Sequence, residues 1–447
     1  MRLPLILGIL GILSVLPGEV PAFRAGAGLT GGPATATPHA APDASGPRDP
    51  IASLRERLEA GELTLAYDSA RGYLPSLLEA LDVPISSQVL VFSRTSLQTD
   101  RIAPWAPRAL YFNDDVYVGW VQESPIIEIA SIDPLRGAVF YTLSQGDPEQ
   151  PTFTRETTTC LMCHESRTIT GGVPGLIVRS VLADRLGYFI TNVHEGATTD
   201  RTPIEDRWGG WYVTGTHGSI THAGNVRAPL LSHEVPVTSR YLGELDLTAG
   251  GNVTELGEHF YTDAYLAPHS DLVALMVLTH QSHVHNLITQ VHEEATAALR
   301  LHELRMRARA ADAGDSIPQE LASGDGPVER LVRAMLFVRE APLNGPVRGT
   351  SGFAEEFAAR GPHDEQGRSL RDLDLETRLF RHPLSFMIYS ESFDALPDVT
   401  KRIVGRRLGE VLSGEDDDPD FAHLTPEGRR AIAEILRATK PGMLTVP

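Results

Sequence analysis

The chain has 447 residues, of which 42% are hydrophobic and 22% charged, so it contains enough apolar material for one large or two ordinary domains. Its formal net charge is −19, from 58 acidic and 39 basic side chains. A surface this acidic repels nucleic acid and anionic lipid, which excludes both as partners, whereas it would suit a basic protein or simply keep the chain soluble.

The first residues are typical of an export signal. Arg2 is followed by a mainly apolar run over residues 3–16, and Val20-Pro21-Ala22 provides small residues for cleavage. The run is too short to cross a membrane comfortably. We therefore predict a cleaved signal peptide over residues 1–22 and a periplasmic or secreted protein, with an uncleaved anchor as the alternative.

Residues 23–50 consist mostly of Ala, Gly, Pro, Thr and Ser, and we expect a disordered linker because such a stretch cannot bury enough apolar surface to fold. A formal G-x-G-x-x-G lies within it at Gly26–Gly31. No predicted strand precedes these glycines, so they do not indicate a dinucleotide site.

Residues 51–150 indicate a mixed α/β segment. Short helices are expected near 54–58 and 74–81. Runs rich in β-branched and aromatic residues, separated by turn residues, predict short and mostly antiparallel strands. These runs are 89–92, 109–112, 116–121, 126–132 and 138–143.

The rest of the chain changes from strands to helices. In residues 151–270, the runs 176–182 and 188–193 predict a hairpin, and the segment Gly209–Gly224 is expected to be irregular. Residues 271–447 are expected to be helical. The expected helices are 271–310 (whole or broken), 328–340, about 371–392, 400–412 and 426–438. The predicted fold class is therefore α+β.

Both cysteines of the chain lie in one motif, Cys160-Leu161-Met162-Cys163-His164. The spacing C-x-x-C-H is that of covalent haem attachment. Two thiols that add to the vinyl groups of neighbouring pyrroles must leave one face of a turn, and the next residue then places its imidazole beneath the iron.

Two other chemistries use paired cysteines. A C-x-x-C pair in an exported protein can form a disulfide or a redox pair, although the strand–helix unit that usually carries a redox pair is not evident here. A zinc site would need two more ligands, which His280 and His283 could supply at an unusual spacing. Zinc is not expected.

The motif resembles that of the c-type cytochromes. The resemblance implies one covalent haem c, with thioether links to Cys160 and Cys163 and with His164 as the proximal iron ligand. Here, however, the motif follows a long strand-rich segment, and no methionine occurs between Met162 and Met276. We therefore do not expect the small all-helical cytochrome fold alone.

Two residues are candidates for the distal iron ligand. His280 lies on the apolar face of the helix expected from residue 271, where a hydrogen-bonded core histidine is the alternative. Met387 lies in an apolar segment, where core packing is the alternative. A third region, with Trp208, His217 and His222 among glycines, could form a wall of the haem crevice or be an ordinary glycine-rich loop.

The resemblance implies transfer of single electrons between redox partner proteins of the periplasm or membrane. A haem-dependent oxidoreductase of peroxidase type and a haem-based sensor are the alternatives. Because the chain has one C-x-x-C-H, it cannot form a two-haem peroxidase arrangement by itself.

Overall fold

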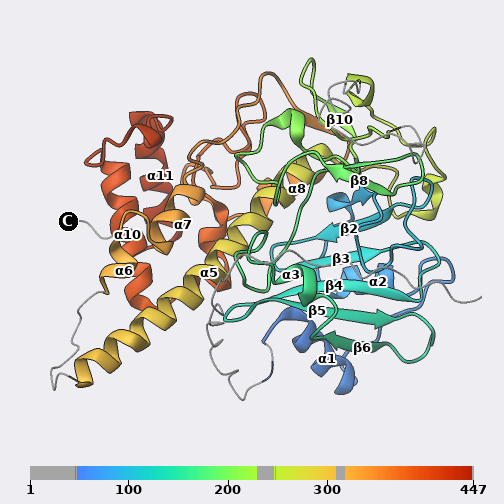
Figure 1. Ribbon diagram of the computed structural model, residues 1–447, viewed down its shortest axis with the longest axis horizontal. Coiled ribbons are helices and arrows are strands. Elements are labelled where there is room, and N and C mark those ends of the chain that lie inside the picture. The colour runs from blue at the N-terminus through green and yellow to red at the C-terminus, as the bar shows by residue number, and fades with distance from the viewer. Residues whose placement is uncertain (1–45, 47, 229–245, 247, 309–317, 445–447) are drawn as a thin grey trace, which may run out of the picture. The chain divides into compact units, whose positions relative to one another are not determined.

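The structure is a computed structural model that describes residues 46, 48–228, 246, 248–308 and 318–444 (Figure 1). The predicted signal peptide and almost all of the predicted linker lie outside these residues. The linker prediction extends slightly too far, because Asp49 and Pro50 begin helix α1 (Pro50–Glu59). The Asp49 carboxylate accepts hydrogen bonds from the first backbone N–H groups of the helix, and Pro50 has no N–H that needs a partner.

The first half of the chain contains a seven-stranded antiparallel sheet with the strand order β6-β5-β4-β3-β2-β1-β9 (Figure 1). The strands are β1 (Val89–Val91), β2 (Arg108–Phe112), β3 (Val116–Trp120), β4 (Ile126–Asp133), β5 (Gly137–Ser144), β6 (Thr152–Glu156) and β9 (Trp211–Tyr212). The five strands expected from residues 89–143 are confirmed. Strand β6 was missed because this edge strand is largely exposed and lacks an apolar stripe.

The two faces of the sheet are buried against different partners. Ile127 and Ile129 of β4 point into a core shared with α1 and with α2 (Leu74–Ala80). On the opposite face, Ile132 packs into the core shared with the long helix α5 (Leu272–Ala308). The alternation along each strand therefore places every second side chain on the α5 face.

Shorter strands follow the sheet. The predicted hairpin is confirmed as β7 (Val181–Ala183) and β8 (Phe189–Asn192). The segment Gly209–Gly224 contains only two-residue strands, β9 and β10 (Gly215–Thr216), so its irregular character is also confirmed. Strand β10 pairs with β11 (Arg348–Gly349) from the C-terminal half.

Helix α5 joins the sheet to the C-terminal helices. Its N-terminus is capped by Asp271, whose carboxylate accepts hydrogen bonds from the N–H groups of Val273 and Ala274. The residues from Leu272 to Leu278 are all buried, and the burial continues with few interruptions to Val291. The helix is continuous, so of the whole and the broken helix that the sequence allowed, the structure has the whole one.

Six helices of the described residues follow α5, and the short helix α3 (Leu161–His164) precedes it. The six are α6 (Gln319–Ala322), α7 (Pro327–Met335), α8 (Phe353–Ala359), α9 (Glu391–Asp394), α10 (Asp398–Ser413) and α11 (Pro426–Thr439). The helices expected at 400–412 and 426–438 are confirmed. The helix expected at 328–340 is present but ends at Met335, because the chain turns at Phe337 and Arg339, which adopt φ values of 56° and 63°. The fold is therefore α+β, with a large antiparallel sheet before the helices.

The helix expected over residues 371–392 is wrong. Asp374 forms a side-chain turn in which its carboxylate accepts hydrogen bonds from the N–H groups of Glu376 and Thr377. Leu375 adopts a φ of 57°, and Pro383 cannot donate to a helical hydrogen bond. The segment is buried by tertiary contacts, which gives it the apolar composition of a helix without the conformation.

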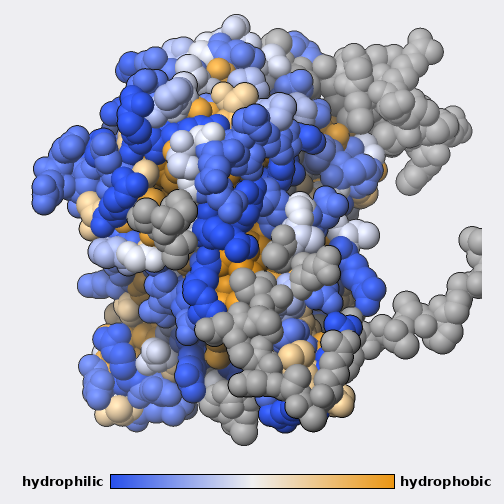
Figure 2. Space-filling view, turned by 90° about the vertical axis from the view of Figure 1, so that its left-hand side faces the viewer, coloured by the Kyte–Doolittle hydropathy of each residue, from blue (hydrophilic) through white to orange (hydrophobic). Residues whose placement is uncertain are grey.

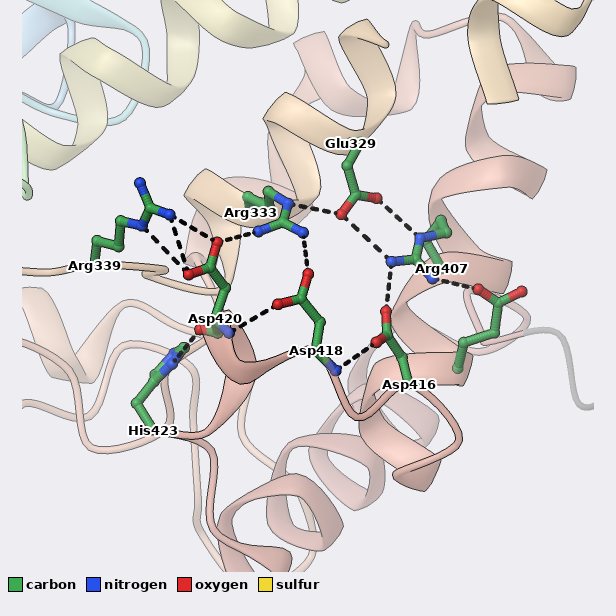
Figure 3. Close-up of polar contacts among 9 residues, drawn as sticks. Glu329, Arg333, Arg339, Arg407, Asp416, Asp418, Asp420 and His423 are labelled. Carbon is green, nitrogen blue, oxygen red and sulfur yellow. Dashed lines mark hydrogen bonds and ion pairs between the residues drawn. The ribbon is translucent and has the colours of Figure 1, made fainter. Parts of the chain in front are cut away.

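An ion-pair network fixes the C-terminal helices (Figure 3). Glu329 of α7 lies between two guanidinium groups, those of Arg333 at 2.9 Å and Arg407 of α10 at 2.9 Å. Arg333 also contacts Asp418, and Arg407 contacts Asp416. Each arginine is thus shared between a helix carboxylate and the acidic loop that precedes α11, which holds α7, α10 and the loop together.

The face of the molecule shown in Figure 2 is largely hydrophilic, with a narrow strip of hydrophobic residues near the centre. Within the residues that the structure describes, no helix combines the length and the apolar character needed to cross a bilayer.

Candidate functional site

The C-x-x-C-H motif forms one helical turn. Cys160 caps the short helix α3, and its carbonyl oxygen accepts hydrogen bonds from the N–H groups of Cys163 at 3.2 Å and His164 at 3.0 Å. Neither cysteine is in a disulfide; Cys160 is half-buried and Cys163 is exposed. The turn therefore presents two free thiols three residues apart, immediately before the imidazole.

The His164 imidazole is fixed by a backbone carbonyl. Its Nδ1 lies 2.9 Å from the carbonyl oxygen of Gly175, and the Gly175 N–H donates back to the His164 carbonyl at 2.8 Å. A carbonyl can only accept, so Nδ1 carries the proton and Nε2 keeps a lone pair. This is the tautomer that a metal-binding histidine requires.

Helix α5 holds the loop that fixes His164. The Asn286 side chain accepts a hydrogen bond from the N–H of Leu176 and donates to its carbonyl, each at 2.8 Å. A Cβ at Gly175 would lie 2.4 Å from the Asn286 Oδ1 atom. Glycine is therefore required where the loop passes between α5 and His164.

The protonation states also fit a ligand role for the histidine. Burial lowers the pKa of His164, which keeps the imidazole neutral. Burial, together with the carboxylates of Glu156 and Glu128, raises the pKa of Cys160 to about 11. A redox C-x-x-C pair needs a thiol whose pKa is lowered, so this environment disfavours that alternative.

The sheet face beside the turn is only partly covered. On strand β4, the residues Ile126, Glu128 and Ala130 that face the turn are half-buried, whereas Ile127 and Ile129 on the other face are buried. Strand β6 is largely exposed, and Met162 between the two cysteines is 75% exposed. The thiols therefore border a partly exposed surface, and together with the lone pair of His164 they are the donor types that haem c requires.

Three residues that sequence reasoning missed lie beside the turn. The Phe140 ring of β5 lies 4.6 Å from the His164 ring, measured between centroids. Arg108 and Glu128 form an ion pair at 2.7 Å in which the Nε of Arg108 and the Oε1 of Glu128 have no partner among the described residues. Only the strand pairing brings these residues to the motif, and no local sequence signal marks them.

The structure does not support His280 as the distal ligand. Its Nδ1 lies 2.8 Å from the Asp200 carboxylate and its Nε2 lies 2.7 Å from the Ser385 hydroxyl. Both ring nitrogens are thus engaged inside the core, where His280 is 0% exposed. No lone pair is left for iron or for zinc, so we interpret His280 as a hydrogen-bonded core residue.

Hydrogen bonds link Asp200, His280 and Ser385 in the order Asp–His–Ser, which is the arrangement of the catalytic triad of a serine hydrolase. Burial by itself would raise the pKa of Asp200, yet the adjacent His280 holds that pKa below its usual range. Ser385 is 0% exposed, and the His280 ring stacks on Phe337 at 4.4 Å. Since no substrate reaches a fully enclosed hydroxyl, the three residues are a structural network.

The remaining candidates are Met387 and the segment with Trp208, His217 and His222. Met387 is 1% exposed in the core beside Ser385, and the Met387 N–H donates a hydrogen bond to the Ser385 hydroxyl. Its role as an iron ligand stays a prediction. The segment with Trp208 and Trp211 leads into β9, at the sheet edge opposite to β6. This segment is therefore separated from Phe140 of β5 by the width of four strands.

Comparisons with protein-family models, curated proteins and solved structures found no match. Within the described residues, no three His, Cys, Asp or Glu side chains form a group that could hold a metal ion by themselves. A haem site would require no such group, because a porphyrin supplies four of the iron ligands.

Proposed function

We propose that this chain is an exported, single-haem c-type cytochrome that transfers electrons through haem c bound covalently to Cys160 and Cys163. The observation that carries the proposal is the geometry of one turn. Two free thiols and a neutral imidazole lie on Cys160–His164, and the Gly175 carbonyl holds the imidazole with Nε2 unprotonated.

Each residue of the turn has a separate role in this proposal. The thiols of Cys160 and Cys163 would hold the group, and His164 would be the proximal iron ligand. Gly175 orients the imidazole and keeps the proton on Nδ1. When bound, haem supplies a one-electron couple. The Arg108–Glu128 pair adds charged groups beside it that influence the reduction potential.

Haem staining after denaturing electrophoresis tests the covalent attachment. The protein is produced with its export signal in a host that matures c-type cytochromes. We expect a stained band of the mature protein, and no stain for the double variant Cys160→Ala, Cys163→Ala. Met162→Ala lies between the two cysteines and is the matched control, which should stain like the wild type. An unstained wild-type band would contradict the proposal.

The optical spectrum separates electron transfer from the two alternatives. We expect the reduced protein to have the sharp bands of six-coordinate haem and to ignore carbon monoxide, since electron transfer needs no free position. High-spin bands and a carbon monoxide shift would instead indicate an oxidoreductase or a sensor. In that case haem binding would stand and the electron-transfer role would be wrong.

A further inference from the structure

A second site lies in the segment that precedes and follows strand β9. Trp208, His217 and His222 are each 2% exposed. The ring of His222 lies between the other two, with centroid distances of 5.5 Å to Trp208 and 4.8 Å to His217. The three side chains therefore form one buried group of nitrogen-containing rings.

Backbone hydrogen bonds fix the tautomer of both histidines. The N–H of Asn252 donates to His217 Nε2 at 2.8 Å, and the N–H of Gly224 donates to His222 Nδ1 at 3.1 Å. These two nitrogens must be acceptors, so the ring protons lie on His217 Nδ1 and His222 Nε2. Together with Trp208 Nε1, the group contains three N–H donors.

None of the three donors has a partner with hydrogen-bond geometry among the described residues, although all three atoms are buried. The backbone of Ile220 lies close enough to the His217 ring to offset part of the lowering of its pKa by burial. A buried polar group without a partner costs about 1–3 kcal/mol, and native proteins contain few of them. Trp208 also adopts a φ of 64°, which is unfavourable for a bulky side chain. Strain and unpaired donors in one place are typical of a binding site.

The donors determine the class of ligand. A metal ion is excluded, because the nitrogens concerned carry protons. A single water molecule accepts only two hydrogen bonds and must donate two of its own. An anion accepts three and donates none. Burial and the neighbouring His217 lower the pKa of His222 to about 3, so at neutral pH the group is uncharged and a multiply charged anion would be too costly to bury.

We propose that Trp208 Nε1, His217 Nδ1 and His222 Nε2 bind a small monovalent anion. Gly218 and Ser219 are exposed, and Ile220 and Thr221 are half-buried. This short loop connects the two histidines. The site does not depend on haem, because it lies near β9 at one edge of the sheet, whereas the C-x-x-C-H turn lies beside β5.

Titration of the mature protein with sodium formate and, separately, sodium bromide tests the proposal. The side-chain indole N–H signals are followed by nuclear magnetic resonance. We expect saturable binding of at least one ion, with the largest shift at one of the four indole signals. Saturation by formate alone would indicate an oxyanion, and saturation by bromide alone would indicate a halide.

Variants identify the atoms. Trp208→Phe and His222→Phe remove an N–H but keep a ring, and each should weaken binding about tenfold or more, since a hydrogen bond to a charged group is lost. Trp105→Phe changes a tryptophan that is 55% exposed and should bind like the wild type.

Crystals of the wild-type protein grown with bromide decide the question even where a variant does not fold. An anomalous peak within hydrogen-bond distance of the three nitrogens is the expected result. Water alone at this place, an adventitious ion only, or the absence of saturable binding for both ions would overturn the proposal.

Discussion

His164 and His280 are both held by hydrogen bonds, but only one of them has a nitrogen to offer. His164 uses Nδ1 on the Gly175 carbonyl and keeps Nε2 free on a half-buried turn. His280 uses both nitrogens, on Asp200 and Ser385, in a core without solvent. The number of hydrogen bonds to the ring, more than the residue type, thus separates a candidate iron ligand from a structural residue.

Exchanging each histidine for alanine gives the largest expected contrast. His280→Ala leaves Asp200 buried without its partner, and we expect a loss of about 3–5 kcal/mol in the free energy of unfolding. His164→Ala removes one hydrogen bond and should lower that free energy by about 1 kcal/mol. Chemical denaturation measures both changes.

The haem spectrum of the same two variants should show the reverse order. His164→Ala should lose the low-spin spectrum, whereas folded His280→Ala should keep the wild-type bands. A spectrum that changes with His280 and not with His164 would mean that the roles of the two residues have been exchanged.

Acid should destabilise the protein through its buried histidines. Burial lowers the pKa of His285 to about 4, against about 6.5 in the unfolded chain. Below pH 6.5 the unfolded state therefore binds a proton that the folded state does not. The contribution of neutral His285 to the free energy of unfolding is fully present above pH 6.5. As the pH decreases toward 4, this contribution falls by about 1.4 kcal/mol per pH unit.

The variant His285→Gln isolates that contribution. Glutamine can donate to the Asp114 carbonyl that now contacts His285 Nε2 at 2.8 Å, but it does not titrate. Unfolding midpoints measured between pH 7 and pH 4 should fall less steeply for this variant than for the wild type. Equal slopes would show that His285 is not buried as a neutral residue.

An effect smaller than that of His280→Ala is expected at the loop that orients His164. Gly175→Ala places a Cβ against Asn286, and we expect a destabilisation of about 1–3 kcal/mol together with a shifted haem spectrum. Gly257→Ala is the control, because a Cβ there would meet no atom within 4 Å. If both variants keep the wild-type spectrum, the loop does not position the imidazole.

The sequence predicted the parts that depend on local patterns. Alternation of apolar residues identified β2 to β5, and the spacing of Cys160, Cys163 and His164 identified the turn. It could not identify Gly175, Asn286 or Arg108 as neighbours of the turn, since these contacts depend on how α5 and the strands pack. The helix predicted over residues 371–392 was wrong for a related reason, because burial gave this irregular segment the apolar composition of a helix.

The covalent link to haem is the claim on which the proposed function depends, and the intact mass of the mature protein tests it most directly. Under denaturing conditions we expect the mass of the processed chain plus one haem, with no thiol open to alkylation. The mass of the chain alone, two hydrogens lighter because Cys160 and Cys163 have joined in a disulfide, would contradict the proposal.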